Sequence, residues 1–164
     1  MLERKTVQSA DYRDAMSRYA GHVQLVTTES AGIRRGVTVT AACSVSDRPP
    51  IVLVCLNRSN PHNAIFLESG NFAVNTLAVQ HQSMASAFAG LDEKDADERF
   101  AMGEWDTIST GSPTLCDAMA VFDCNLMEHK DMATHMVLFG EVVGLRIGEP
   151  QTSLLFMDRQ WRSL

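Results

Sequence analysis

The stretch from Gly36 to Pro50 constrains this chain most, because it begins as a β-strand and then loses its bulk. Residues 37–40 alternate valine with threonine, which is the two-residue period of a strand. Residues 41–44 are Ala-Ala-Cys-Ser, and such small side chains let a flat molecule approach the backbone. Backbone amides and hydroxyls would then form a ledge for a cofactor. An ordinary strand packed against a neighbour is the alternative, and this stretch alone favours it.

Composition predicts one globular domain over residues 1–164, with a loose lead-in over 1–9. The net charge of -6 and the absence of a Lys/Arg cluster argue against nucleic acid and anionic membrane as partners. No apolar run approaches the roughly 20 residues that span a bilayer. The N-terminus shows no apolar signal core, and the four cysteines form no CxxC pair. We therefore expect a cytoplasmic protein with buried, reduced thiols, and the histidine spacing predicts no metal site.

Periodicity and turn residues predict six or seven strands and three short helices. Helix signals include a cap at Asp11, a cap at Asn60 with proline next, and a glycine stop at Gly90. The acidic stretch 91–104 is expected to be exposed and partly helical. The predicted helices cover 11–19, 60–69 and 80–88, and the strands cover 22–28, 36–46, 51–57, 72–77, 118–128, 134–145 and 154–157.

This order of elements favours an antiparallel barrel. The strands do not alternate regularly with helices, which argues against a doubly wound parallel sheet. The sequence contains neither GxGxxG nor GxxxxGK[ST], the two standard phosphate loops. The unbroken apolar run over 51–56 predicts a strand that is covered on both faces. A closed or partly closed barrel is the expected architecture.

Six segments, in order and over nearly the whole chain, resemble the flavin reductase family with the split-barrel FMN-binding fold. The resemblance implies a mainly β, Greek-key split barrel with a few short helices. The acidic segment 91–98 matches no family motif, so the resemblance says nothing about substrate access there. The matching segments are 13–16 with 21–28, 36–50, 53–59, 72–77, 88–90 with 99–100, and 134–142.

The resemblance also implies a flavin site in three parts. The small-residue strand lies along the flavin, a second turn contacts it, and a third turn meets the ribityl phosphate. In that third turn Arg58 offers a charged fork of donors to the phosphate, whereas a solvated surface arginine is the alternative. Phe88 taken alone would be a core residue. The implied cofactor-binding residues are Thr38, Thr40, Ala41, Ala42, Cys43, Ser44, Ser46, Asn57, Arg58, Ser59, Phe88, Ala89 and Gly90.

His135 is the catalytic candidate, because similar reductases carry a histidine at the start of this late strand. Its imidazole would orient the nicotinamide over the flavin. The flavin itself accepts the hydride, so catalysis would consist mostly of positioning. Without the resemblance, His135 would be interpreted as a half-exposed histidine at a strand end.

The implied activity is NAD(P)H-dependent reduction of flavin, with FMN favoured over FAD and either NADH or NADPH as donor. The resemblance also implies a homodimer that passes electrons onward, for example to a monooxygenase component. Close relatives of the same fold reduce a corrin, as cob(II)yrinic acid a,c-diamide reductase does, and others act in pyrimidine degradation. A non-enzymatic FMN-binding module and a plain β-domain without cofactor are the alternatives from other classes.

Overall fold

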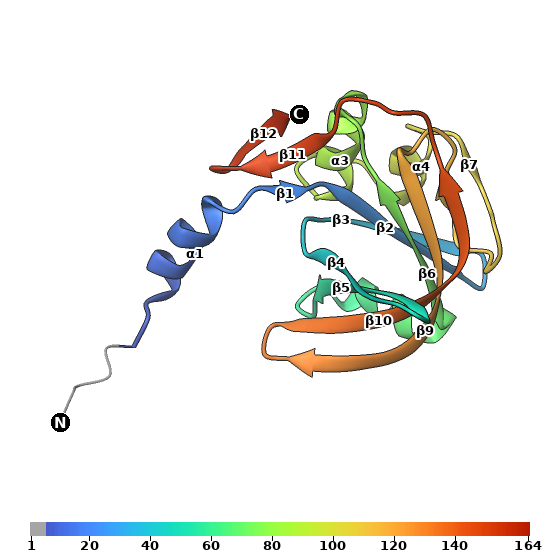
Figure 1. Cartoon of the computed structure of the whole chain (residues 1–164), viewed down its shortest axis with the longest axis horizontal. Helices are drawn as coiled ribbons and strands as arrows, with labels where there is room; N and C mark the ends of the chain where they lie inside the picture. The colour runs from blue at the N-terminus through green and yellow to red at the C-terminus, as the bar shows by residue number, and fades with distance from the viewer. Residues whose placement is uncertain (1–5) are drawn as a thin grey trace.

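The computed structural model describes residues 6–164 and is mainly β, as the sequence predicts (Figure 1). Residues 1–5 of the predicted lead-in lie outside the described residues. None of the helices described is long and apolar enough to cross a membrane. The helices are α1 (Ser9–Ser17), α2 (Ile65–Ser69), α3 (Gln82–Phe88) and α4 (Ala96–Phe100), with 3-10 turns η1 (Pro61–Ala64) and η2 (Val79–His81).

Seven strands form the main sheet, in the order β3-β2-β6-β9-β10-β5-β4, and every neighbouring pair is antiparallel. The other strands build two smaller sheets, β1-β11-β12 and β7-β8. The strands are β1 (Gly21–His22), β2 (Gln24–Ser30), β3 (Ile33–Val39), β4 (Ala42–Asp47), β5 (Pro50–Asn57), β6 (Asn71–Thr76), β7 (Trp105–Asp106), β8 (Thr114–Leu115), β9 (Ala120–Met132), β10 (His135–Ile147), β11 (Leu154–Met157) and β12 (Gln160–Ser163).

The prediction of one strand over 36–46 is wrong, because the chain changes sheet edge in the middle of it. β3 pairs with β2 at one edge of the main sheet, and β4 pairs with β5 at the other edge. Thr40 and Ala41 alone join the two strands. Three Cα–Cα steps reach at most about 11 Å, so the sheet must curl until its edges approach each other. The Cys55 amide donates to the Ala41 carbonyl at 2.9 Å and holds this crossing in place.

Two hydrophobic clusters lie on opposite faces of the sheet. Alternation along β2 sends Leu25 into one cluster and Val26 into the other, and alternation along β6 divides Ala73 from Val74 in the same way. Helices α3 and α4 contribute to the first cluster, and α2 contributes to the second. The sheet is therefore packed on both faces at its centre.

The prediction that β5 is covered on both faces is wrong for this single chain. Val54 and Leu56 are buried, whereas Ile51, Val52 and Leu53 keep part of their surface exposed. The strand lies next to β4, which is an edge strand of the sheet. An apolar strand is thus left partly uncovered.

Helix α1 projects from the body and buries none of its residues (Figure 1). The predicted cap at Asp11 is wrong: Gln8 occupies the cap position without a side-chain hydrogen bond, and Asp11 lies in the first turn. The end of the helix is fastened to the β11–β12 turn, where the Asp158 amide donates to the Ser17 carbonyl at 2.6 Å. Arg18 pairs with Asp158 at 3.3 Å.

Other local predictions are confirmed. The Asn60 side chain accepts a hydrogen bond from the His62 amide at 3.1 Å, with proline at the next position. Gly90 ends α3 with φ of 76°, in the left-handed region that glycine adopts readily. The acidic stretch is partly helical, because Asp95 caps α4 by accepting from the Glu98 amide at 2.9 Å.

Candidate functional site

The predicted flavin ledge lies on the exposed edge of the curled sheet. Thr40, Ala41, Cys43 and Ser44 are exposed, while Ala42 and Ser46 are partly buried. Since β4 is an edge strand, a row of its backbone N–H and C=O groups faces away from the sheet. Within residues 6–164 no strand pairs with the outer edge of β4, whereas its inner edge pairs with β5, so a flavin contact by the ledge stays a prediction.

The ledge forms one wall of an apolar hollow of about 580 Å³. The hollow is also lined by β10, at Val142 to Leu145, and by Val74 and Phe122. Its volume lies within the range of small-molecule and cofactor pockets. The residues present therefore fit a planar aromatic group that is held by backbone donors on one side and apolar side chains on the other. The ledge residues that line the hollow are Ala42, Cys43, Ser44 and Ser46.

Thr38 is placed differently from the rest of the ledge. It lies on β3, and its hydroxyl donates to the Ala85 carbonyl of α3 at 2.7 Å. This hydrogen bond connects the strand to the helix that packs on it, so the hydroxyl proton is already used. A flavin contact by Thr38 stays a prediction.

The predicted phosphate turn and the catalytic candidate lie side by side, although the sequence separates them widely. Asn57 ends β5 and is the direct pairing partner of His135 at the start of β10. The Arg58 amide donates to the Thr134 carbonyl at 3.0 Å. The Ser59 amide donates to the Asn57 side chain at 2.8 Å, which closes the turn. The antiparallel β5–β10 pair thus brings both parts of the predicted site together.

Arg58 does not present a free charge to solvent. Its guanidinium pairs with Asp131 of β9 at 3.0 Å and donates to the Ala133 carbonyl at 3.3 Å. Both side chains of the pair are about half exposed, so the pair contributes only about 0–1 kcal/mol to stability. Sequence reasoning missed Asp131 because nothing in the hairpin sequence identifies which turn it faces.

His135 is exposed, and its contact with the nicotinamide stays a prediction. Its Nδ1 lies 2.9 Å from the Thr134 hydroxyl, and Nε2 has no hydrogen bond within residues 6–164. One ring nitrogen is thus oriented by its neighbour and the other faces outward without a protein partner. The ring can donate or accept one further hydrogen bond.

Phe88 belongs to the core. Its ring makes edge contacts with Phe100 at 5.1 Å and with Trp105 at 6.3 Å between centroids. A Cβ at Gly36 would meet this ring at 2.5 Å, so the strand needs glycine there. Ala89 and Gly90, directly after Phe88, are exposed. A flavin contact at this turn would therefore involve Ala89 and Gly90 more directly than the Phe88 ring.

The cysteines are free, but the prediction that they are buried holds for Cys124 and fails for Cys43 and Cys116, which are exposed. Burial and the neighbouring Asp123 raise the pKa of Cys124 to about 12. Burial, followed by the charge of Cys43, raises the pKa of Cys55. Residues 6–164 contain no cluster of side chains suited to hold a metal ion.

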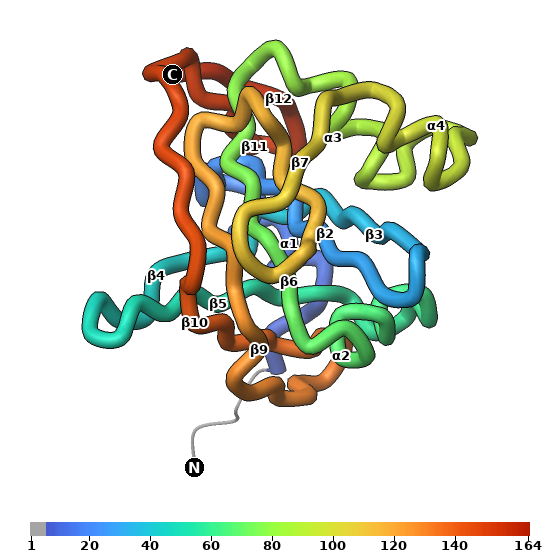
Figure 2. Tube along the Cα trace, turned by 90° about the vertical axis from the view of Figure 1, so that its right-hand side faces the viewer, coloured from blue at the N-terminus to red at the C-terminus, as the bar shows by residue number. Residues whose placement is uncertain are grey.

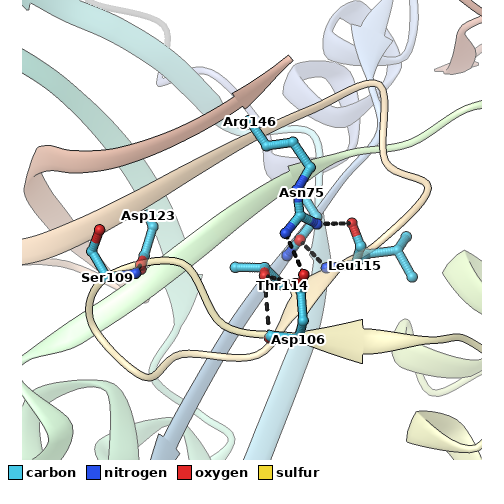
Figure 3. A network of polar contacts seen from close by, with 7 residues as sticks. All are labelled: Asn75, Asp106, Ser109, Thr114, Leu115, Asp123 and Arg146. Carbon is cyan, nitrogen blue, oxygen red and sulfur yellow. Dashed lines mark hydrogen bonds and ion pairs between the residues drawn. The ribbon is translucent and has the colours of Figure 1, made fainter. Parts of the chain in front are cut away.

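A polar network fastens the 107–118 connection against the sheet beneath the hollow (Figure 3). Arg146 of β10 pairs with Asp106 at 2.6 Å, and this hydrogen bond lowers the pKa of Asp106. The Asn75 side chain accepts from the Leu115 amide at 2.8 Å. Buried Asp123 accepts from the amides of Ser109 and Thr110 at 2.7 and 2.8 Å. The network thus bonds the connection to β10 at Arg146, next to Leu145, which lines the hollow.

The family model described as "Flavin reductase like domain" matches residues 16–164, and the chain therefore belongs to this family. "FMN reductase (NADH) RutF" of Agrobacterium fabrum is 41% identical over 165 residues, covering 99% of this chain and 94% of that protein. Among solved structures, flavin reductase PheA2 has a TM-score of 0.87 at 30% identity, covering 96% of this chain and 99% of that one. BorF, the flavin reductase component of a bacterial two-component tryptophan halogenase, has a TM-score of 0.86 at 28% identity, covering 96% and 98%.

Proposed function

We propose that this chain is an NADH-dependent FMN reductase that uses a ledge, a turn and a histidine as one site. The observation that carries the proposal is the pairing of Asn57 with His135, which joins the predicted flavin turn to the predicted nicotinamide residue. Relatives about 41% identical along almost the whole chain bear the name FMN reductase (NADH). Their name favours FMN over FAD, and NADH over NADPH.

The chain's own residues would act mainly by positioning. The edge of β4, with Ala42 to Ser44, would bind the flavin ring through backbone groups. The small side chains there would leave room for the flat ring. The Asn57–Ser59 turn would hold the ribityl side. His135 would orient the nicotinamide through its outward ring nitrogen. When bound, FMN supplies the acceptor for the hydride, so the protein needs no acid or base of its own for that step.

We propose a homodimer of the family's split-barrel type, assembled through the surface that the single chain leaves uncovered. The half-covered β5 strand and the exposed end of β10 support this proposal. Val143, Leu145 and Ile147 of β10 are 42%, 55% and 82% exposed, which is unusual for a run of aliphatic side chains. The four free thiols support a cytoplasmic location. Reduced flavin would pass to a separate acceptor, such as a monooxygenase component.

The test is the absorption spectrum of the purified protein with FMN, recorded before and after anaerobic addition of NADH or NADPH. We expect the oxidised-flavin band to bleach much faster with NADH than it does for free FMN. Bound flavin that neither nucleotide bleaches would replace the proposal with a passive FMN-binding module. Bleaching of tightly retained flavin, followed by reoxidation with a cob(II)yrinate, would instead favour the corrin reductase. Sedimentation velocity tests the homodimer, and a monomer at micromolar concentration would contradict it.

A further inference from the structure

A second hollow, of about 490 Å³, lies apart from the ledge, since the two share no lining residue. It is formed by β3, by the η1–α2 segment and by the start of α4, and Figure 2 shows β3 with α4 above it and α2 below. Basic side chains dominate its walls, with two carboxylates among them. The charged and titratable residues that line it are Arg34, Arg35, His62, Glu68, Lys94, Asp95 and Arg99.

Two of its cations are already neutralised and two are not. Arg34 pairs with Asp97 at 3.6 Å, and Lys94 pairs with Asp92 at 3.0 Å. Arg35 and Arg99 have no carboxylate partner within residues 6–164. The hollow therefore holds two guanidinium groups whose charge nothing in the described chain balances.

These two arginines are close enough to repel each other. Burial, followed by the charge of Arg99, lowers the pKa of Arg35. The Arg35 Nε and Nη2 atoms both donate to the neutral side-chain oxygen of Asn63, at 3.1 and 2.9 Å. The Arg99 Nε is buried and has no hydrogen-bond partner within residues 6–164. Two like charges beside an unused buried donor cost stability, and a bound anion would remove that cost.

A buried amide connects this hollow to the proposed flavin turn. Asn63 is 2% exposed, and it accepts from Arg35 while its amide nitrogen donates to the Asn57 carbonyl at 2.9 Å. Both ends of the amide are used, so its orientation is fixed. The position of Arg35 is thereby coupled to the turn that ends β5, whereas Arg58 in that turn already has Asp131 as its partner.

We propose that Arg35 and Arg99 form a phosphate-binding subsite that serves the neighbouring reductase site. Guanidinium groups bind phosphate through paired, charge-assisted hydrogen bonds, and two of them match the charge of a phosphate dianion. The ligand is a nucleotide phosphate, either the terminal phosphate of FMN or a phosphate of the nicotinamide dinucleotide. Glu68 and Asp95 both limit the positive charge of the hollow, and Asp95 also caps α4. This inference rests on the proposed function for the identity of the nucleotide.

The experiment compares FMN with riboflavin, which lacks the phosphate, in the full-length protein and in Arg35→Met, Arg99→Met and the double variant. Lys94→Met is the matched control, because Lys94 lines the same hollow but is paired with Asp92. If the subsite binds the phosphate of FMN, we expect FMN to bind about tenfold more weakly to each arginine variant, while riboflavin binding changes less than about twofold. If the subsite binds a phosphate of NADH, we expect FMN binding to stay unchanged. The KM for NADH, measured with riboflavin as acceptor, should then rise about tenfold. Arginine variants that match wild type in both measurements overturn the subsite.

Titration of wild-type protein with inorganic phosphate keeps the test decisive if an arginine variant fails to fold. We expect phosphate to raise the melting temperature more than chloride does at equal ionic strength. Equal effects of the two anions would contradict the subsite. A wild-type protein that prefers FMN to riboflavin but is not reduced by NADH would support the subsite while removing the proposed reductase activity.

Discussion

Arg58 lies in the Asn57–Ser59 turn, and Arg35 is linked to the same turn through Asn63. Sequence position favours Arg58 as the charge available to a ligand, but the surroundings of the two arginines favour Arg35. Arg58 lies in the turn itself, next to Asn57 and Ser59, yet its charge is shared with Asp131 at 3.0 Å. Arg35 lies in the middle of β3, yet its guanidinium donates to the neutral side chain of Asn63, has no carboxylate partner within residues 6–164, and has its pKa lowered by burial and by the charge of Arg99. The comparison teaches that the availability of a charge depends on its partners, which are set by strand pairing.

The largest expected effect on FMN binding comes from a bulky substitution on the ledge, where the flavin ring would lie. Ala41 is exposed at the crossing between β3 and β4, so Ala41→Trp should leave the fold intact and block the approach of a flat ring. We expect FMN binding to be lost in equilibrium titrations. Leu91→Trp, at an exposed position outside both hollows, is the control and should bind FMN normally. Normal FMN binding by the Ala41 variant would move the flavin away from this ledge and from both arginines.

His135→Ala separates the nicotinamide side of the turn from the flavin side. The outward ring nitrogen of His135 would make one hydrogen bond to the nicotinamide, and one such bond is worth about 0.5–1.5 kcal/mol. We therefore expect FMN reduction by NADH to slow about fivefold while FMN affinity stays the same. Stopped-flow absorption measures the first quantity and equilibrium titration the second. Unchanged reduction would remove His135 from the site, and lost FMN binding would place it on the flavin side.

Arg58→Ala and Asp131→Asn test whether the ion pair with Asp131 keeps the charge of Arg58 from the flavin phosphate. Because Arg58 shares its charge, its removal should weaken FMN binding only about threefold, less than the loss expected for Arg35. Asp131→Asn releases Arg58 from its partner and should strengthen FMN binding by a similar factor. Equilibrium titration at low and high salt measures both. A loss at Arg58 that exceeds the loss at Arg35 would assign the phosphate to the turn.

The smallest effect is expected at Asp106, in the network behind the hollow (Figure 3). The hydrogen bond from Arg146 lowers the pKa of Asp106 in the folded state. The ionised carboxylate therefore stabilises the fold above its unfolded pKa of about 3.9, and this contribution is lost as pH falls through the lower folded value. Asp106 is half exposed, so Asp106→Asn should cost less than about 1 kcal/mol near neutral pH. Denaturant titrations should show a shallower acid-side loss of stability in the variant, and identical pH profiles would contradict this role.

Local signals in the sequence predicted much of the fold. Alternating β-branched residues, the Asn60–Pro61 cap and the stop at Gly90 each depend on neighbours within a few residues, so no tertiary information is needed to interpret them. The predicted cap at Asp11 is wrong, so a local signal of this kind does not always fix where a helix begins. The helix begins directly after Gln8, which makes no side-chain cap hydrogen bond, so the strong capping tendency of Asp11 did not decide where the helix starts.

The candidate site was predicted less completely, because it depends on pairings between distant strands. Family resemblance identified the Asn57–Ser59 turn and His135, but only the β5–β10 register places them side by side. Phe88 illustrates the opposite outcome, since packing against Phe100 and Gly36 places its ring in the core. Arg35 carries no local signal, because a lone arginine in a strand is ordinarily a solvated surface residue. Arg99 belongs to the matching segment 99–100, but the resemblance implied no role for it.

The sequence by itself determined a mainly β chain with a small-residue ledge, since side-chain size and alternation are properties of each short segment. Tertiary structure alone decided that Thr40 and Ala41 cross between the two edges of one sheet and that β5 stays partly uncovered. It also decided which arginine is neutralised and which is not. The physical reason is that strand pairing and charge pairing join residues that are far apart in the sequence. Their separation along the chain does not predict which of them will be in contact.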